Sequence, residues 1–325
     1  MMRTFAYVRA SSLSDAIKQL GTEGARAHSG GTDLVGCLRD GVMQAKTVVS
    51  LSALKDMRGI SATADGGLRI GALTTIAEIA ASPLVKEKYA ALADAASVIA
   101  SPQLRNQGTI GGNLNQRPRC WYFRGDYDCA RKGGGMCYAV GGENQYHAIF
   151  GGGACVYVHP SDSAPALVAF DASVRAAGPK GERVIPVEKF FVLPDVAVTR
   201  ETVLEPGEIV TEVVLPAPTA GVKSSYRKVR ARQSWDFALV GVALAVTFRP
   251  DRRVDRARVV FSGVAPTPWR SAAVEQAITG QRLDARTLAR AADAAVAGAE
   301  PLEKNGYKIA LLRGAVEEAL GKIGV

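Results

Sequence analysis

The stretch from residue 115 to residue 153 constrains this chain more than any other part of the sequence. It holds nine glycines and several Trp, Tyr and Phe residues, but it shows no sustained helical or strand periodicity. A connection of this length inside a compact domain is usually functional or disordered, and its aromatic content argues against disorder. We therefore expect a bound group to give this segment its order.

Four of the five cysteines lie in or just beyond this segment, spaced as Cys120-x8-Cys129-x7-Cys137-x17-Cys155. Because a reducing cytoplasm disfavours disulfides, such a cluster favours metal binding or catalysis. The spacing has neither the C-x2–4-C knuckle typical of zinc sites nor the C-x2-C-x2-C run of bacterial ferredoxins. On the residues alone, a four-iron cluster, a zinc ion and buried thiols all remain open. Cys37 stands apart, and we interpret it as a buried small hydrophobic residue.

Two loops with paired glycines form the second informative feature. They are AHSGGTDL at 27–34 and TIGGNL at 109–114. Adjacent glycines let a backbone approach a ligand closely, and successive N–H groups in such a turn form an anion-binding concavity. Two such loops could clamp the phosphates of one pyrophosphate, although either loop alone is also explained by a tight turn. Neither fits the G-x-G-x-x-G or the P-loop pattern.

Length and composition indicate a two-domain protein with an ordinary core. The chain has 325 residues, of which 47% are hydrophobic and 22% charged, and domains average roughly 150 residues. The stretch APTAG at 217–221 is a plausible linker, so we place a boundary near residue 220. The net charge of +9 comes without a Lys/Arg tail. We interpret it as a solvated basic surface and expect no nucleic-acid partner.

Neither a membrane span nor an export signal is expected. No run of 18 apolar residues occurs, and the opening MMRTFAYVRASSLSD lacks the apolar core of a signal peptide. The chain is therefore expected to be cytoplasmic, unless another protein carries it out.

Periodicity predicts a mixture of helices and strands. We expect helices at 12–20, 83–100, 285–298 and 307–323, strands at 47–51, 211–216, 237–248 and 257–265, a strand then a helix at 68–80, and a helix then a strand at 163–178.

Taken together, the motifs SGGTDLV, TIGGNL, HPSDSAPALVAFDA and YRKVRAR…DFALVGVAL resemble the FAD-binding medium subunit of the molybdenum hydroxylases over nearly the whole chain. The resemblance implies an α+β fold. Residues 1–220 would form an FAD-binding domain of the vanillyl-alcohol-oxidase (PCMH) type with two α/β subdomains. Residues 221–325 would form an α+β domain of the CO dehydrogenase flavoprotein C-terminal type.

The resemblance also implies where FAD binds. The first loop would line the pyrophosphate with Ala27, His28, Ser29, Gly30, Gly31, Thr32, Asp33 and Leu34. Thr109, Gly112 and Asn113 would contact it from the other side. Asp162 and Lys228 would hold the ligand further along, although alone they are explained by a helix N-cap and a surface lysine. We expect non-covalent FAD, because no histidine stands where we would place a covalent link.

The run from RPRCWYF to HAIFGG is similar to the cluster-bearing insertion of bacterial periplasmic-type aldehyde oxidoreductases. By resemblance, Cys120, Cys129, Cys137 and Cys155 would ligate a 4Fe–4S cluster within an insertion at about 115–155. Several relatives have a further cysteine where this chain has Asn115. Cations would stabilise the negative cluster, and five stand nearby: Arg117, Arg119, Arg124, Arg131 and Lys132. His147 and His159 stay outside the predicted ligand set.

The function implied is the FAD and 4Fe–4S electron-transfer subunit of a heterotrimeric molybdenum-dependent aldehyde oxidoreductase. Its partners would be a large molybdenum-cofactor subunit and a small 2Fe–2S subunit that delivers electrons, and no catalytic residue is assigned to this chain. An export signal on a partner would place the complex in the periplasm. The alternatives are the FAD subunit of a xanthine dehydrogenase or hydroxybenzoyl-CoA reductase, a zinc-binding flavoprotein and a stand-alone flavin oxidase.

Overall fold

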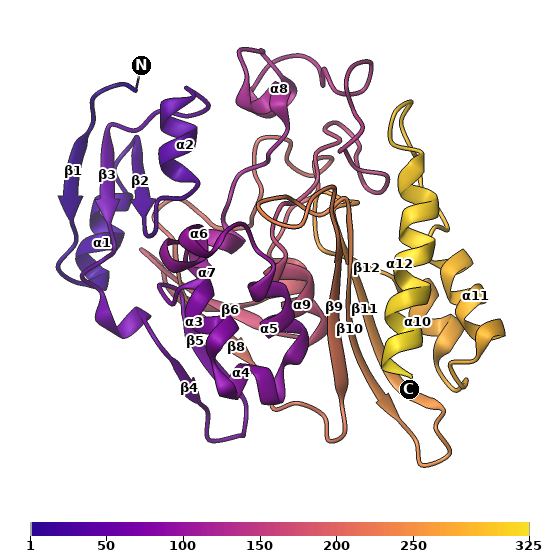
Figure 1. Ribbon diagram of the computed structural model, residues 1–325. Helices are drawn as coiled ribbons and strands as arrows, with labels where there is room; N and C mark the ends of the chain where they lie inside the picture. The colour runs from indigo at the N-terminus through magenta and orange to yellow at the C-terminus, as the bar shows by residue number, and fades with distance from the viewer. Residues whose placement is uncertain (1, 325) are drawn as a thin grey trace.

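The computed structural model describes residues 2–324 and begins with a small parallel sheet (Figure 1). The strands pair in parallel in the order β1-β3-β2. A helix connects each strand to the next one in the sequence. The elements are β1 (Ala6–Arg9), α1 (Leu13–Leu20), β2 (Ala25–His28), α2 (Leu34–Arg39) and β3 (Thr47–Ser50). The predicted helix at 12–20 and strand at 47–51 are confirmed. Ser12 caps α1, because its hydroxyl accepts the backbone N–H of Asp15 at 3.1 Å.

A second sheet of five strands, in the order β4-β5-β8-β6-β7, forms the centre of the molecule. Its strands are β4 (Ile60–Ala62), β5 (Leu68–Gly71), β6 (Ser173–Gly178), β7 (Gly181–Pro186) and β8 (Ile209–Leu215). The helices between β5 and β6 are α3 (Ile76–Ala81), α4 (Pro83–Lys88), α5 (Ala90–Ser97), α6 (Pro102–Gln107), α7 (Ile110–Leu114), α8 (Trp121–Arg124) and α9 (Ser163–Ala169). Short 3-10 turns cover Lys55–Met57, Ala130–Lys132 and Val187–Lys189.

The predicted single helix at 83–100 is wrong, because the chain breaks at Tyr89 into α4 and α5. Tyr89 has φ −138° and ψ 55°, outside the helical region. Its buried ring packs edge-on to Phe170 at 5.1 Å, and its hydroxyl donates to the carbonyl of Pro216 at 2.7 Å. A tertiary contact therefore overrides the helical propensity of this segment.

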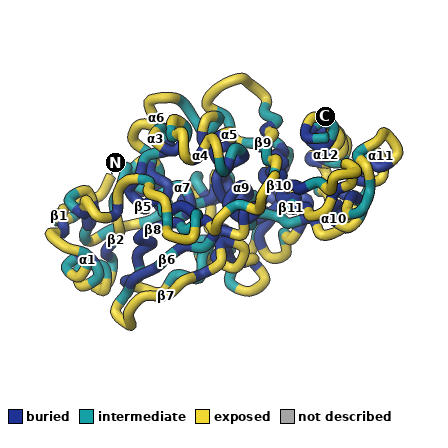
Figure 2. The backbone as a smooth tube through the Cα atoms, turned by 90° about the horizontal axis from the view of Figure 1, so that it is seen from below, coloured by how far each residue is buried: buried dark blue, intermediate teal, exposed yellow. Residues whose placement is uncertain are grey.

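The C-terminal part is an antiparallel sheet, in the order β12-β11-β10-β9, backed by three helices. The elements are β9 (Lys223–Val229), β10 (Val240–Phe248), β11 (Val254–Ser262), β12 (Trp269–Arg270), α10 (Ala272–Ile278), α11 (Ala285–Ala294) and α12 (Tyr307–Ile323). Figure 2 shows the buried backbone concentrated along α9, β10 and β11, with the exposed stretches in the outer turns.

Strand β10 separates two hydrophobic cores. Ala243 and Ala245 belong to the core shared with the five-stranded sheet, whereas Val242 and Leu244 belong to the core under the C-terminal helices. Successive side chains of a strand point to opposite faces. The apolar run in β10 is therefore a strand that is covered on both sides.

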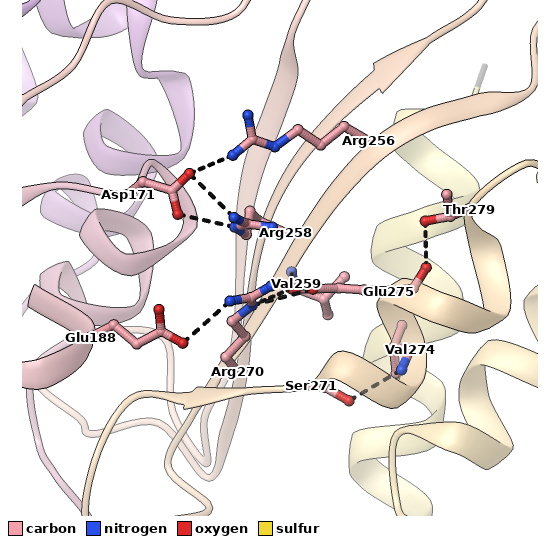
Figure 3. Close-up of polar contacts among 10 residues, drawn as sticks. All are labelled: Asp171, Glu188, Arg256, Arg258, Val259, Arg270, Ser271, Val274, Glu275 and Thr279. Carbon is pink, nitrogen blue, oxygen red and sulfur yellow. Dashed lines mark hydrogen bonds and ion pairs between the residues drawn. The ribbon is translucent and has the colours of Figure 1, made fainter. Parts of the chain in front are cut away.

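Ion pairs of β11 and β12 join the C-terminal sheet to the region of α9 and the five-stranded sheet (Figure 3). Arg256 and Arg258 of β11 contact Asp171, which follows α9, at 2.7 and 3.0 Å. Arg270 lies 3.4 Å from Glu188 and 2.8 Å from Glu275, and these carboxylates raise its pKa. Charged pairs therefore supplement the apolar packing at this junction.

The segment at 115–155 contains only α8 and one 3-10 turn, as its lack of periodicity predicts. Figure 1 shows it as irregular loops above the two larger sheets, between α2 and the start of α12. None of the helices described within residues 2–324 combines the length and apolar character needed to cross a membrane.

Candidate functional site

The two glycine loops, eighty residues apart in sequence, meet in the structure. The hydroxyl of Ser29, which follows β2, lies 3.0 Å from the hydroxyl of Thr109. Thr109 also caps α7, because its hydroxyl accepts the backbone N–H of Gly112 at 3.2 Å. The loops therefore form one surface of backbone and hydroxyl groups.

Two positions in the first loop require glycine. A Cβ on Gly30 would lie 2.0 Å from the carbonyl oxygen of Gln107. Gly31 has φ +71°, and a Cβ there would lie 2.6 Å from Nε2 of His28. Both the close approach and the left-handed backbone exclude a side chain. This is the geometry expected where main-chain N–H groups face a ligand.

A hollow of about 190 Å³ opens beside the loops. Its predicted lining residues are Ala27, Ser29, Gly30, Gly31, Thr32, Asp33, Leu34, Thr109 and Gly112. Arg26 and Arg117 also line it, and the sequence analysis did not assign either to FAD. Arg26 is half-buried and its Nε has no hydrogen-bond partner. Burial and the nearby Arg117 lower the pKa of Arg26, so an anion in this hollow would relieve an unpaired cation.

Asp33, predicted to line the pyrophosphate, also holds the cysteine-bearing segment. Its carboxylate accepts the backbone N–H of Arg117 at 2.7 Å. It pairs with the guanidinium groups of Arg119 and Arg124 at 2.9 and 2.8 Å. Arg119 and Arg124, two of the five cations expected beside the cluster, therefore neutralise a carboxylate on the glycine loop.

Asp162 and Lys228 form a buried ion pair of 2.8 Å, with 5% and 2% of their side chains exposed. The hydroxyl of Tyr226 donates to Asp162 at 2.6 Å, and Lys228 also donates to the carbonyl of Val98. Asp162 stands at the N-cap position of α9 but makes no capping hydrogen bond. The simple explanations, a helix cap and a surface lysine, are therefore both wrong.

Asn113 lies between the glycine-loop hollow and the buried pair of Asp162 and Lys228. Its side-chain oxygen accepts the hydroxyl of Ser161 at 2.6 Å, and that hydroxyl also accepts the backbone N–H of Ala164. The second glycine loop is thereby tied to the turn that carries Asp162.

A second hollow, of about 260 Å³, lies between the cysteine-bearing segment and the C-terminal sheet. Ser161, Asp162 and Ser262 line one part, and Cys120, Trp121 and His147 line another. Phe237 and Leu239 make its remaining wall largely apolar. A planar group here would lie between the buried ion pair and the first cysteine of the segment.

The cysteines of the segment have free thiols and interact with one another. The Cys155 thiol donates to Cys137, and this bond, with the N–H groups of Val156 and Ala139, lowers the pKa of Cys137 to about 5. The same bond and burial raise the pKa of Cys155.

Burial raises the pKa of Cys120 to about 11, although the backbone N–H groups of Phe123 and Tyr122 act in the opposite direction. The charges of Cys137 and Cys129 act on Cys120 as well. Cys120 thus lies within electrostatic range of Cys137 and Cys129, and Cys137 is hydrogen-bonded to Cys155.

Within residues 2–324, no group of three or more Cys, His, Asp or Glu side chains is arranged to hold a metal ion. The four sulfurs therefore do not form a single-ion site in this arrangement. Asn115 does not face them, since its side chain donates to the carbonyl of Gly111. Cys37 is fully buried and lines the glycine-loop hollow, where the charges of Arg124, Arg117 and Arg119 act on its thiol.

Arg131 anchors the cysteine-bearing segment to the central domain. Its guanidinium is almost fully buried, stacks 4.0 Å over the ring of Tyr157 and pairs with Glu201 at 2.9 Å. Arg117 shares the same carboxylate at 2.9 Å. Lys132 donates to the carbonyl of Gly125. These cations therefore fix the backbone around the cysteines as well as supplying positive charge.

Two buried histidines face the second hollow. Burial and the charge of Lys308 lower the pKa of His147 to about 4, and burial and Arg131 lower that of His159 to about 3. Both imidazoles are therefore neutral near neutral pH.

Residues 3–218 match the FAD binding domain in molybdopterin dehydrogenase. The chain belongs to this family. Residues 224–322 match the CO dehydrogenase flavoprotein C-terminal domain, so the two matches together span nearly the whole sequence. The predicted family and fold class are thereby confirmed, and the chain is an FAD-binding subunit of an oxidoreductase.

Named relatives agree with this assignment. The chain is 37% identical to the aldehyde oxidoreductase FAD-binding subunit PaoB of Escherichia coli, over 99% of this chain and 98% of that one. It is 28% identical to the carbon monoxide dehydrogenase medium chain of Hydrogenophaga pseudoflava, over 97% and 96% of the chains. A solved carbon monoxide dehydrogenase from the same organism superposes with a TM-score of 0.79 at 27% identity, covering 99% of this chain and 98% of that one.

Proposed function

We propose that this chain is the FAD and 4Fe–4S electron-transfer subunit of a heterotrimeric molybdenum-dependent aldehyde oxidoreductase. The observation that carries the proposal is the direct attachment of the flavin loop to the cysteine-bearing segment through Asp33. The aldehyde class is supported by the 37% identity to a protein named as an aldehyde oxidoreductase subunit. We further place a functional division near residue 220, between the FAD-binding domain and the C-terminal domain.

The two hollows suit the two ends of FAD. The glycine-loop hollow offers backbone N–H groups, hydroxyls and the unpaired Nε of Arg26 to the pyrophosphate. The second hollow offers apolar walls to the flavin ring beside Asp162. Lys228 would hold the Asp162 carboxylate in place next to the ring. When bound, FAD supplies the chemistry of accepting and releasing electrons, while the protein binds it, orients it and limits its contact with water.

The cysteine-bearing segment suits a four-iron cluster in its choice of donors. The hydrogen bond from Cys155 lowers the pKa of Cys137, and backbone N–H groups donate to Cys120, Cys137 and Cys155. Thiolates are the ligands that iron–sulfur clusters require, and hydrogen bonds to the sulfurs set their potentials. A single zinc ion needs sulfurs about 2.3 Å from one centre. The four thiols of the segment would supply one ligand for each iron of a four-iron cluster.

We also propose that this chain works with two partner subunits. A small 2Fe–2S subunit would deliver electrons to FAD, and a large subunit would hold the molybdenum cofactor and oxidise the aldehyde. FAD would then reduce an external acceptor. We propose a cytoplasmic location, or a periplasmic one if a partner subunit carries the export signal.

Anaerobic titration of the purified complex tests this function. An aromatic or aliphatic aldehyde should bleach the flavin absorbance, whereas hypoxanthine should leave it unchanged. Bleaching by hypoxanthine alone would assign the chain to a xanthine dehydrogenase instead. Flavin without additional iron absorbance in the isolated medium chain would remove the cluster from the proposal while leaving the flavin role intact.

A further inference from the structure

The strongest unassigned feature is the contact between His147 and Cys120. Nε2 of the imidazole lies 3.2 Å from the Cys120 sulfur. The sequence analysis set His147 aside because four cysteines complete a cluster without it. Its position against one of those cysteines gives it a different role.

The backbone around His147 is held firmly. Its N–H donates to the carbonyl of Asn144 at 2.9 Å. Its own carbonyl accepts from Nζ of Lys308 at 2.9 Å and from the side chain of Asn305 at 3.1 Å. Lys308 is fully buried and also donates to the carbonyls of Tyr146 and Gly263. The C-terminal domain, through α12, therefore sets the position of this imidazole.

Apart from its contact with Cys120, the ring lies mainly against aromatic side chains. It packs against Trp121 and Tyr122, with centroids 5.9 and 6.5 Å away. Nδ1 is buried and has no hydrogen-bond partner. The residue is 4% exposed, so bulk water does not surround it. The side chain is thus directed at the sulfur in a site from which bulk water is excluded.

We propose that His147 is a positioning residue that donates its Nε2–H to the Cys120 sulfur and raises the reduction potential of the cluster. The inference rests on the proposed 4Fe–4S site. A cysteine bound to iron has lost its proton, so its sulfur can only accept a hydrogen bond. The imidazole must then be the donor, in either of its charge states.

The direction of the effect follows from charge. Reduction adds an electron to the cluster and makes its sulfurs more negative. A hydrogen bond to a sulfur is stronger in that state and favours it, so the potential rises. Burial strengthens the effect because little water competes for the sulfur.

Two substitutions separate the hydrogen bond from the packing. His147→Phe keeps a ring against Trp121 but has no donor, whereas His147→Gln keeps an N–H of similar reach. Redox titration of the intact complex, followed by electron paramagnetic resonance, measures the cluster potential in each. His159→Phe is the matched control, because His159 is buried in the same hollow but its polar contact is with the backbone of Ser161.

His147→Phe should keep its iron and lower the potential by an amount equivalent to a tenfold change in the reduced-to-oxidised ratio, ~59 mV for one electron. His147→Gln should lie close to the wild type, and His159→Phe should leave the cluster potential unchanged. Equal potentials in the wild type and His147→Phe would overturn the inference and leave the proposed function standing. Loss of iron in both His147 variants would also overturn it, by making the histidine a requirement for assembly. A wild-type complex without a four-iron signal would refute the cluster itself.

Discussion

Asp33 of the first glycine loop lies 2.8 Å from the guanidinium of Arg124 in α8, and this ion pair joins the two proposed cofactor sites. The same carboxylate accepts from the backbone of Arg117 and pairs with Arg119. Because one side chain holds both the flavin loop and the cysteine-bearing segment, a disturbance at either site should reach the other.

Substituting Asp33→Asn tests this link. The change removes the charge from a partly buried network, and hydrogen bonds to charged groups contribute roughly 1.5–3 kcal/mol each. We expect weaker FAD retention and faster loss of iron from the same variant. The matched control is Asp40→Asn, since the pair between Asp40 and Arg39 is exposed and should change little. Loss of flavin without any change in iron would contradict the coupling.

Gly31→Ala should yield protein with little bound flavin. Its Cβ would press on Nε2 of His28 at a backbone angle of φ +71°. Gly41 has the same φ of +71° but open space around it. Gly41→Ala therefore carries the backbone strain alone, roughly 1–2 kcal/mol, without disturbing the loop. Flavin-to-protein absorbance ratios of the two purified variants check the prediction. Full flavin occupancy in Gly31→Ala would show that the loop does not contact the pyrophosphate.

The buried pair of Asp162 and Lys228 predicts a strongly non-additive pair of substitutions. Asp162→Asn leaves a buried ammonium without its carboxylate, and Lys228→Met leaves the carboxylate alone. Each should lower the free energy of unfolding by roughly 3–5 kcal/mol, because an unpaired buried charge is costly. The double variant should lose much less than the sum. Chemical denaturation of all three variants measures this, and strict additivity would mean that the two charges do not stabilise each other.

The buried histidines predict a loss of stability in acid. The pKa of His159 falls from 6.5 to about 3 on folding, so the unfolded state binds a proton that the folded state does not. This contribution to stability is complete above pH 6.5 and is lost as the pH falls toward 3. It amounts to about 1.4 kcal/mol per pH unit in that window. His159→Phe should show a shallower decline between pH 6.5 and 4.5 in denaturation experiments. Parallel declines in the two proteins would contradict the prediction.

Local patterns predicted much of the fold. The capped helix at the start, the strand then helix at 68–80 and the terminal helix follow from periodicity and capping residues, which act over a few positions. Thr75 and Glu78 form the capping box that begins α3. The break at Tyr89 could not be predicted in this way, because it depends on a contact with Pro216, more than a hundred residues away.

Some residues of the candidate site could also be predicted from motifs, and others could be recognised only in the structure. The two paired-glycine loops with hydroxyl neighbours together favour a phosphate site, and the family resemblance adds Asp162 and Lys228. Arg26 directly precedes the first glycine loop, but no motif marks it as a ligand, and its place in the lining of the hollow is known only from the structure. Lys308 sits in an amphipathic helix, yet it is fully buried against three carbonyls that arrive from other elements. Long-range partners of this kind leave no local signal.

Iron, zinc and flavin analysis of the purified complex tests the central claim most directly. The comparison is between the wild type, Cys129→Ser and Cys37→Ser. Because each of the four cysteines would bind one iron, Cys129→Ser should lose about four irons per flavin relative to the wild type. Cys37→Ser should lose none, since Cys37 lies beside the glycine loops. An unchanged iron content in Cys129→Ser, zinc in place of iron, or iron loss in Cys37→Ser would contradict the assignment of a 4Fe–4S cluster to this chain.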